Sequence, residues 1–166
     1  MNFLKPIVFF LLFTLSSGAF AQNQKPLVYN PEADAKAELQ AAIKTAKASN
    51  KHVLVQVGGN WCSWCIKFHN LTTTDAQLDS TIKANYVVLK VNHSKEVPNL
   101  AVLEALEYPQ RFGFPVFVVM DGNGKRLHTQ NSAYLEEDKG YSKKKSLEFL
   151  GHWSKPALAA ERYKKR

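Results

Sequence analysis

The feature that most constrains this chain is a run of apolar, mostly β-branched residues, Val53-Leu54-Val55-Gln56-Val57, that leads directly into Trp61-Cys62-Ser63-Trp64-Cys65. A nearly continuous apolar run of this length is typical of a strand buried on both faces, as in the centre of a parallel sheet. Gly58-Gly59-Asn60 ends the strand, and residues 62–70 are predicted to begin a helix. Both cysteines are therefore expected where a central strand passes into a helix.

Helical and strand patterns alternate along the rest of the chain. Helices are predicted over residues 31–50, 98–111 and 142–153, for a segment capped by Thr74-Asp75 that runs through Ala84, and for a short basic stretch after 154–156. Strands are predicted over residues 86–91, 116–120 and 125–129, the last two joined by a hairpin turn at 121–124. Residues 22–30 are predicted as a linker or short edge strand, and residues 134–141 as a polar loop. This order predicts an α/β fold with a central mixed sheet of about four to five strands flanked by helices.

The N-terminus has the pattern of a removable secretion signal. Lys5 precedes a short apolar run over residues 7–15, and Ala19-Phe20-Ala21 is the small-x-small pattern that signal peptidase accepts. The run is shorter than the roughly 20 residues that span a bilayer. We therefore predict a signal peptide over residues 1–21, cleaved after Ala21, and one domain over 22–166 in the periplasm or outside the cell. An uncleaved anchor is the alternative.

The composition, with 45% hydrophobic and 22% charged residues, is ordinary for a folded domain. The formal charge of +8 comes largely from residues 143–145 and 162–166. These runs are predicted to be a solvated helix face and a C-terminal tail, since an exported protein rarely meets nucleic acid. Weak attraction to anionic lipids or acidic partners is the alternative.

The chain has two cysteines, and both lie in one tetrapeptide. A disulfide across two intervening residues closes almost no loop, so it is poorly placed to stabilise a fold and well placed for chemistry. Cys62 is expected at a helix N-terminus, where the helix dipole favours a thiolate. Cys65, one turn later, is placed to attack a mixed disulfide formed at Cys62.

The strand, the motif and the later Phe114-Pro115 together resemble the thioredoxin superfamily, and more narrowly its exported bacterial members with a Trp-Cys-x-x-Cys centre. The resemblance extends over residues 35–153. It implies that Pro115 is a cis-proline packed against the disulfide, with the backbone of Phe114 presented to a substrate chain; an ordinary trans proline is the alternative. Trp61 and Trp64 would form an apolar rim for polypeptide, although Trp64 is as compatible with a packing role.

Two features depart from that family. A buried acid often precedes the motif and accepts the proton of the resolving thiol, whereas this chain has Gln56, which does not titrate. The intervening pair is Ser63-Trp64 and not the Gly-Pro of thioredoxin, so thioredoxin's strongly reducing character does not carry over. The sequence also excludes the motif for covalent haem attachment. That motif requires C-x-x-C-H, whereas the residue after Cys65 is Ile66.

His69 is the main candidate for an additional chemical role, and His93, which follows the strand over 86–91 and would face the same edge, is the second. His69 follows Cys65 by four residues, so a helix would place the two on the same side. It is predicted to be a solvated helical histidine. The alternatives are assistance in proton transfer and a metal site made by Cys62, Cys65 and His69, although structural zinc usually takes four protein ligands.

These features together predict a thiol–disulfide oxidoreductase for protein substrates of the cell envelope. The resemblance implies that Cys62 attacks and Cys65 resolves, in a reductase or electron carrier that a membrane thiol transporter reduces. We expect a monomer without metal or organic cofactor, because the dithiol itself carries the two electrons. Disulfide isomerase or oxidase activity, and a redox-inactive scaffold that binds a client, are the alternatives.

Overall fold

A four-stranded mixed sheet forms the centre of the molecule, with strand order β2-β1-β3-β4. The computed structural model describes residues 27–164, and the predicted signal peptide lies outside them. Strand β1 runs parallel to β2 and antiparallel to β3, which pairs antiparallel with β4. The strands are β1 (His52–Gly58), β2 (Tyr86–Asn92), β3 (Val116–Met120) and β4 (Arg126–Asn131).

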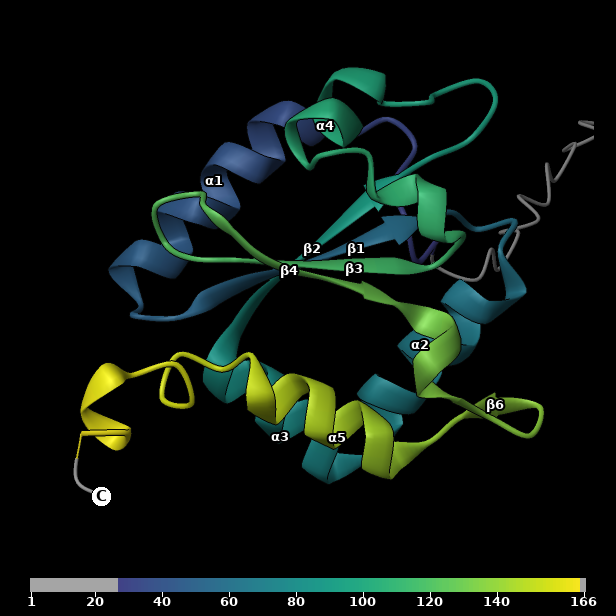
Figure 1. Cartoon of the computed structure of the whole chain (residues 1–166). Coiled ribbons are helices and arrows are strands. Elements are labelled where there is room, and N and C mark those ends of the chain that lie inside the picture. The colour runs from purple at the N-terminus through teal and green to yellow at the C-terminus, as the bar shows by residue number, and fades with distance from the viewer. Residues whose placement is uncertain (1–26, 165–166) are drawn as a thin grey trace, which may run out of the picture.

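Helices cover both faces of this sheet. One face carries α1 (Ala35–Ala48) and α4 (Leu100–Ala105), and the other carries α2 (Ser63–Thr74), α3 (Ala76–Asn85) and α5 (Lys143–His152), as Figure 1 shows. The predicted α/β fold with a mixed sheet flanked by helices is thus confirmed. Helices α2 and α3 are separate because Asp75 caps α3, its side chain accepting from the backbone N–H groups of Gln77 and Leu78.

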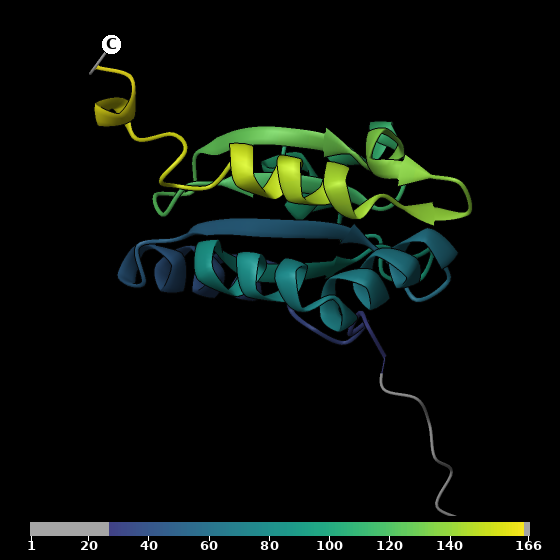
Figure 2. The same ribbon diagram turned by 90° about the horizontal axis from the view of Figure 1, so that it is seen from below.

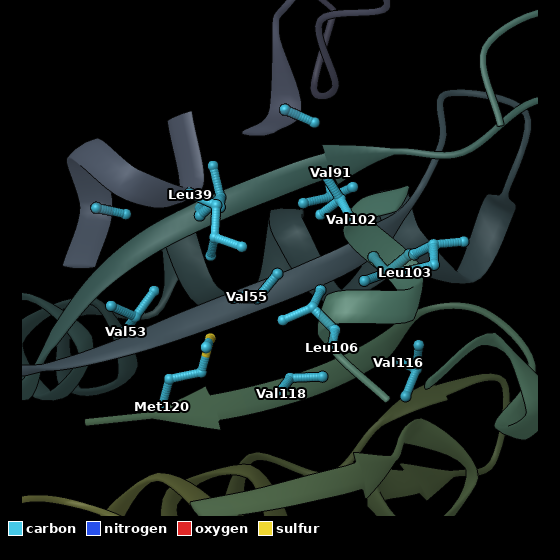
Figure 3. Close-up of a cluster of buried hydrophobic side chains, with 14 of the residues drawn as sticks. Leu39, Val53, Val55, Val91, Val102, Leu103, Leu106, Val116, Val118 and Met120 are labelled. Atoms are coloured by element: carbon cyan, nitrogen blue, oxygen red, sulfur yellow. The ribbon is translucent and has the colours of Figure 1, made fainter. Parts of the chain in front are cut away.

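Two hydrophobic cores lie on opposite sides of the sheet. Successive side chains of a strand point to opposite faces, so Val53, Val55 and Val57 pack toward α1 and α4, whereas Leu54 packs toward α3 and α5. Figure 3 shows the first core, in which valines of β1 and β3 meet Leu39, Val102 and Leu103. All seven residues of β1 are buried, as predicted for a strand covered on both faces.

Two predicted elements were wrong. The helix predicted over 98–111 ends at Ala105, and the chain continues through the short 3-10 helix η1 (Pro109–Phe112). Glu107 and Tyr108 have φ values of 61° and 56°. Because a residue before proline is disfavoured in the helical region, Tyr108 cannot easily extend the helix into Pro109.

The second difference is the segment predicted as a loop over 134–141. It contains the end of a 3-10 helix, η2 (Ser132–Leu135), and a two-stranded ribbon of β5 (Glu136–Glu137) and β6 (Gly140–Tyr141). The Tyr141 ring packs edge-on against Phe68 of α2 with centroids 5.1 Å apart, which gives the ribbon a hydrophobic attachment. Figure 2 shows the ribbon and α2 at one end of the molecule and the C-terminal 3-10 helix η3 (Ala160–Arg162) at the other.

Within residues 27–164, no helix has the length and apolar character needed to cross a membrane.

Candidate redox site

Cys62 and Cys65 form a disulfide at the start of α2. Cys62 is the N-cap residue, and its Sγ accepts a hydrogen bond from the backbone N–H of Cys65 at 3.2 Å. Both side chains are nearly covered, with 6% of Cys62 and 1% of Cys65 exposed. The prediction that Cys62 opens the helix therefore agrees with its position, and Cys62 is the more exposed of the two residues.

Gly58, the last residue of β1, lies directly beneath the disulfide and contacts Cys65. A Cβ at position 58 would collide with Cys65 Sγ and lie 3.0 Å from the hydroxyl oxygen of Tyr29. The absence of a side chain therefore allows the disulfide to pack directly onto the end of the central strand.

Tyr29 is a member of the site that the sequence analysis missed, because residues 22–30 were treated as a linker or edge strand. Its side chain is 1% exposed and packs in one cluster with Cys62 and Cys65. Asn60 holds this segment: its side-chain oxygen accepts from the N–H groups of Val28 and Tyr29, each at 3.0 Å, and its amide donates to the Tyr29 carbonyl at 2.7 Å. No periodic pattern marks a single tyrosine, so the sequence carried no signal for this contact.

Phe114 and Pro115 lie beside the disulfide, immediately before β3. The peptide bond between them is cis, Pro115 is buried and Phe114 is half-buried. Phe114 packs against the cluster of Tyr29 and the two cysteines. Pairing of Val57 with Val116 brings this segment, distant in sequence, to the end of β1 where the motif begins.

Trp61 and Phe114 meet edge to face, with ring centroids 5.5 Å apart. The His93 ring stacks on the Phe114 ring with centroids 5.0 Å apart, and the His93 carbonyl accepts a hydrogen bond from the Trp61 indole N–H at 2.7 Å. These three side chains and Pro98 line a groove of about 560 Å³. Trp61 is 59% exposed, which leaves its ring available at the edge of this groove.

Trp64 lies apart from Trp61, on the side of the β5–β6 ribbon. Its ring meets Tyr141 edge-on with centroids 5.4 Å apart, and the Lys67 ammonium lies 4.2 Å from its ring centre. It is half-buried and also borders the Tyr29 cluster. The structure therefore places Trp64 in a packing environment.

Gln56, Lys90 and His69 line a second cavity of about 460 Å³, between α2 and the edge strand β2. Gln56 is buried with 3% exposure. The Lys90 ammonium lies 2.9 Å from His69 Nδ1. Burial lowers the pKa of His69, and the Lys90 charge lowers it further; burial also lowers the pKa of Lys90.

His69 is thus engaged with Lys90 and does not assemble with the two cysteines. Across residues 27–164, no three histidine, cysteine, aspartate or glutamate side chains gather in a way that could hold a metal ion. The metal-site alternative therefore receives no support from the geometry.

Several solved structures are similar to this chain. A structure of a disulphide isomerase from Xylella fastidiosa is similar at 25% identity over 76% of this chain and 95% of that chain, with a TM-score of 0.68. A thioredoxin-fold protein from Helicobacter pylori matches at 22% identity over 70% and 76%, with a TM-score of 0.42. A structure described as DsbH oxidoreductase matches at 19% identity over 81% and 93%, with a TM-score of 0.44. No curated protein sequence matches the chain.

The family assignment rests on a match that covers the site itself. A family model described as a thioredoxin-like domain matches residues 39–139. This range includes β1, the Cys62–Cys65 disulfide, the cis Phe114–Pro115 bond and the hairpin of β3 and β4. The chain therefore belongs to the family of proteins with a thioredoxin-like domain.

Proposed function

We propose that this protein is a thiol–disulfide oxidoreductase that acts on protein disulfides in the cell envelope, with Cys62 as the attacking and Cys65 as the resolving residue. The observation that carries the proposal is the disulfide between these two residues at the first turn of α2. A three-residue separation at a helix N-terminus adds little to stability and supplies a nucleophile together with a resolving thiol.

The reaction begins with the reduced protein. Backbone N–H groups and the dipole at the start of α2 favour the Cys62 thiolate. This thiolate attacks one sulfur of a client disulfide, the client S–S bond breaks, and the departing client sulfur takes up a proton. Cys65 then loses its proton to water and attacks Cys62 Sγ, which releases the second client thiolate. Two electrons have passed from the dithiol to the client, and no further cofactor is required.

Client binding is assigned to the surface beside Cys62. Trp61 and Phe114 form an aromatic edge there, and the segment of Phe114 and Pro115 lies next to the disulfide cluster. An extended client segment would lie along this edge, with its cysteine at Cys62. Trp64 contributes less, because its ring packs against Tyr141.

We further propose that the protein works as a reductase or electron carrier in the periplasm, reached by cleavage of residues 1–21 and reduced by a membrane thiol transporter. The basis is the secretion-signal pattern and the resemblance to exported Trp-Cys-x-x-Cys proteins. Disulfide isomerisation is the second candidate, and the similarity to the Xylella fastidiosa disulphide isomerase favours it.

The deciding experiment is the reduction potential of the Cys62–Cys65 pair, followed by the fluorescence of Trp61 and Trp64 in glutathione buffers of defined ratio. A reversible two-electron transition near about −270 mV supports a reductase or electron carrier, whereas one between about −120 and −180 mV supports isomerase or oxidase activity. Cys65→Ser is the control, because it should trap mixed disulfides at Cys62 and abolish the transition. A wild-type protein without any reversible transition would contradict the enzyme assignment and leave the scaffold alternative.

A further inference from the structure

Tyr29 is a buried polar side chain that the proposed reaction does not yet use. It comes from the segment before α1, far in sequence from the motif, and its side chain is 1% exposed. It packs in one cluster with Cys62 and Cys65. A tyrosine in such a place has a hydrogen-bond donor beside the two reacting sulfurs.

Asn60 holds Tyr29 in this place. Three hydrogen bonds connect the Asn60 side chain to the backbone of Val28 and Tyr29, at 3.0, 3.0 and 2.7 Å. Asn60 stands between the end of β1 and Cys62. The loop that carries the attacking cysteine and the segment that carries Tyr29 are therefore held by the same side chain.

The position of the hydroxyl is defined by Gly58. A Cβ at Gly58 would collide with Cys65 Sγ and lie 3.0 Å from Tyr29 Oη, so the sulfur and the hydroxyl oxygen border the same small space. The Tyr29 hydroxyl therefore neighbours the resolving sulfur beside Gly58.

Resolution of the mixed disulfide creates a specific need at this point. Cys65 must become a thiolate in a buried position, and burial disfavours the charged form of a thiol. Gln56, two residues before Gly58 on β1, is buried and cannot accept a proton. A hydrogen bond donated to the sulfur would offset the cost of forming the thiolate.

Tyr29 is suited to donate and not to accept a proton. Burial, with a smaller contribution from Tyr141, raises the pKa of the Tyr29 phenol. The phenol therefore keeps its proton throughout the physiological range and remains a neutral donor.

We propose that the Tyr29 hydroxyl donates a hydrogen bond to the Cys65 thiolate during release of the client, and so lowers the pH at which Cys65 becomes able to resolve the mixed disulfide. This proposal rests on the proposed oxidoreductase function. In the step concerned, the Cys65 proton passes to water, the Cys65–Cys62 bond forms, the bond between Cys62 and the client sulfur breaks, and the client leaves as a thiolate. The Tyr29 proton stays on its oxygen throughout.

The test compares wild-type protein with Tyr29→Phe, which keeps the ring and removes the hydroxyl. Reduced protein is mixed rapidly with a disulfide-linked peptide and quenched with acid, and mass spectrometry resolves the mixed disulfide from the released peptide. Release should be about tenfold slower near neutral pH in Tyr29→Phe, and its pH profile should shift upward by about one unit, since a hydrogen bond to a charged group contributes roughly this factor. Formation of the mixed disulfide should keep its rate.

Tyr86→Phe is the matched control. Tyr86 is also buried, and its hydroxyl donates to the Leu150 carbonyl at 2.6 Å, at the opposite end of the β1–β2 pair from Gly58. Removal of the Tyr86 hydroxyl should lower the free energy of unfolding without shifting the pH profile of peptide release. A second variant, Asn60→Ala, releases the Tyr29 segment and should reproduce the shift, with no further shift when Tyr29→Phe is added.

The outcomes separate this proposal from the function on which it rests. If mixed disulfide forms and is resolved in Tyr29→Phe with the wild-type pH profile, the role of Tyr29 is overturned and the oxidoreductase assignment stands. If the wild-type protein forms no mixed disulfide at all, both fail. An equal shift in Tyr86→Phe would also overturn the proposal, because it would assign the effect to general loosening of the fold.

Discussion

At the scale of single residues, the redox site depends on what is absent as much as on what is present. Gly58 leaves the space in which Cys65 packs, and the buried Gln56 has no group that titrates. The position of Cys62 and Cys65 at the start of a helix was predicted correctly from the sequence, because the cysteines directly follow an apolar strand and are separated by about one helical turn. Tyr29 was not readable, because its contact with Cys65 depends on how a segment more than thirty residues away folds back.

Gly58→Ala tests the packing of the disulfide on β1. The added methyl group collides with Cys65 Sγ, and the disulfide leaves that sulfur little freedom to move. We expect the free energy of unfolding of the oxidised protein to fall by about 1–3 kcal/mol, as for other overpacked interiors. Urea unfolding measures it, and the loss should be smaller in the reduced protein, whose sulfur can turn away.

Gly151→Ala is the control for this substitution. A Cβ at position 151 meets nothing within 4 Å, and the residue lies in α5, so its replacement should leave stability unchanged or raise it by up to about 1 kcal/mol. Equal stability of Gly58→Ala and wild type would show that the end of β1 yields to the extra methyl group.

At the scale of elements, the strands whose ends are marked by glycine, asparagine or proline were predicted correctly. The strands over 53–57, 86–91 and 116–120 were predicted correctly because their apolar runs are bounded by glycine, asparagine or proline. The helix predicted over 98–111 was too long, since Pro109 forces Tyr108 out of the helical region. The β5–β6 ribbon was missed because its strands are two residues long and are held by Tyr141 against α2, which is a tertiary contact.

The contact of His69 with Lys90 joins α2 to the edge strand β2 and should make stability depend on pH. The folded-state pKa of His69 lies below its ordinary value of 6.5, through burial and the Lys90 charge. Well above pH 6.5, the His69 imidazole is neutral in both the folded and the unfolded protein. As the pH falls below this value, the unfolded chain binds a proton that the folded protein resists, so the free energy of unfolding decreases.

His69→Asn should remove this decrease, and its stability should change less than that of the wild type between about pH 7.5 and pH 5. Urea unfolding at the two pH values measures the difference. His152→Asn, at an exposed position of α5, is the control and should retain the wild-type dependence. If His69→Asn and the wild type lose stability in parallel, the His69 contact does not govern the acid response.

At the scale of the whole molecule, the sheet separates two cores that share β1 and β3. Leu103 is fully buried on the face of α1 and α4, and Leu150 on the face of α3 and α5. Strands β1 and β3 contribute side chains to both cores. Loss of packing on one face of the sheet therefore also disturbs the strands that the other core packs against. The disulfide lies where β1 ends and α2 begins, on the side of the sheet away from Leu103.

Leu103→Ala and Leu150→Ala should each lower the free energy of unfolding by about 2–5 kcal/mol, as for other leucines truncated in a core. Each variant should unfold in a single transition that coincides by circular dichroism and tryptophan fluorescence. The reduction potential of Leu103→Ala should stay at the wild-type value, because Leu103 lies across the sheet from α2. Two separated transitions in either variant would show that the layers unfold independently.

The sequence by itself determined the α/β class, the central buried strand, the position of the dithiol and its expected chemistry. These follow from interactions between neighbours in the chain: hydrophobic periodicity, turn residues, caps and the spacing of two cysteines. The tertiary structure alone decided that Tyr29 and Asn60 complete the site, that Trp61 joins Phe114 and His93 while Trp64 packs against Tyr141, and that His69 meets Lys90. Each of those contacts brings together residues that sheet pairing and helix packing make neighbours, and no local pattern in the chain records such distances.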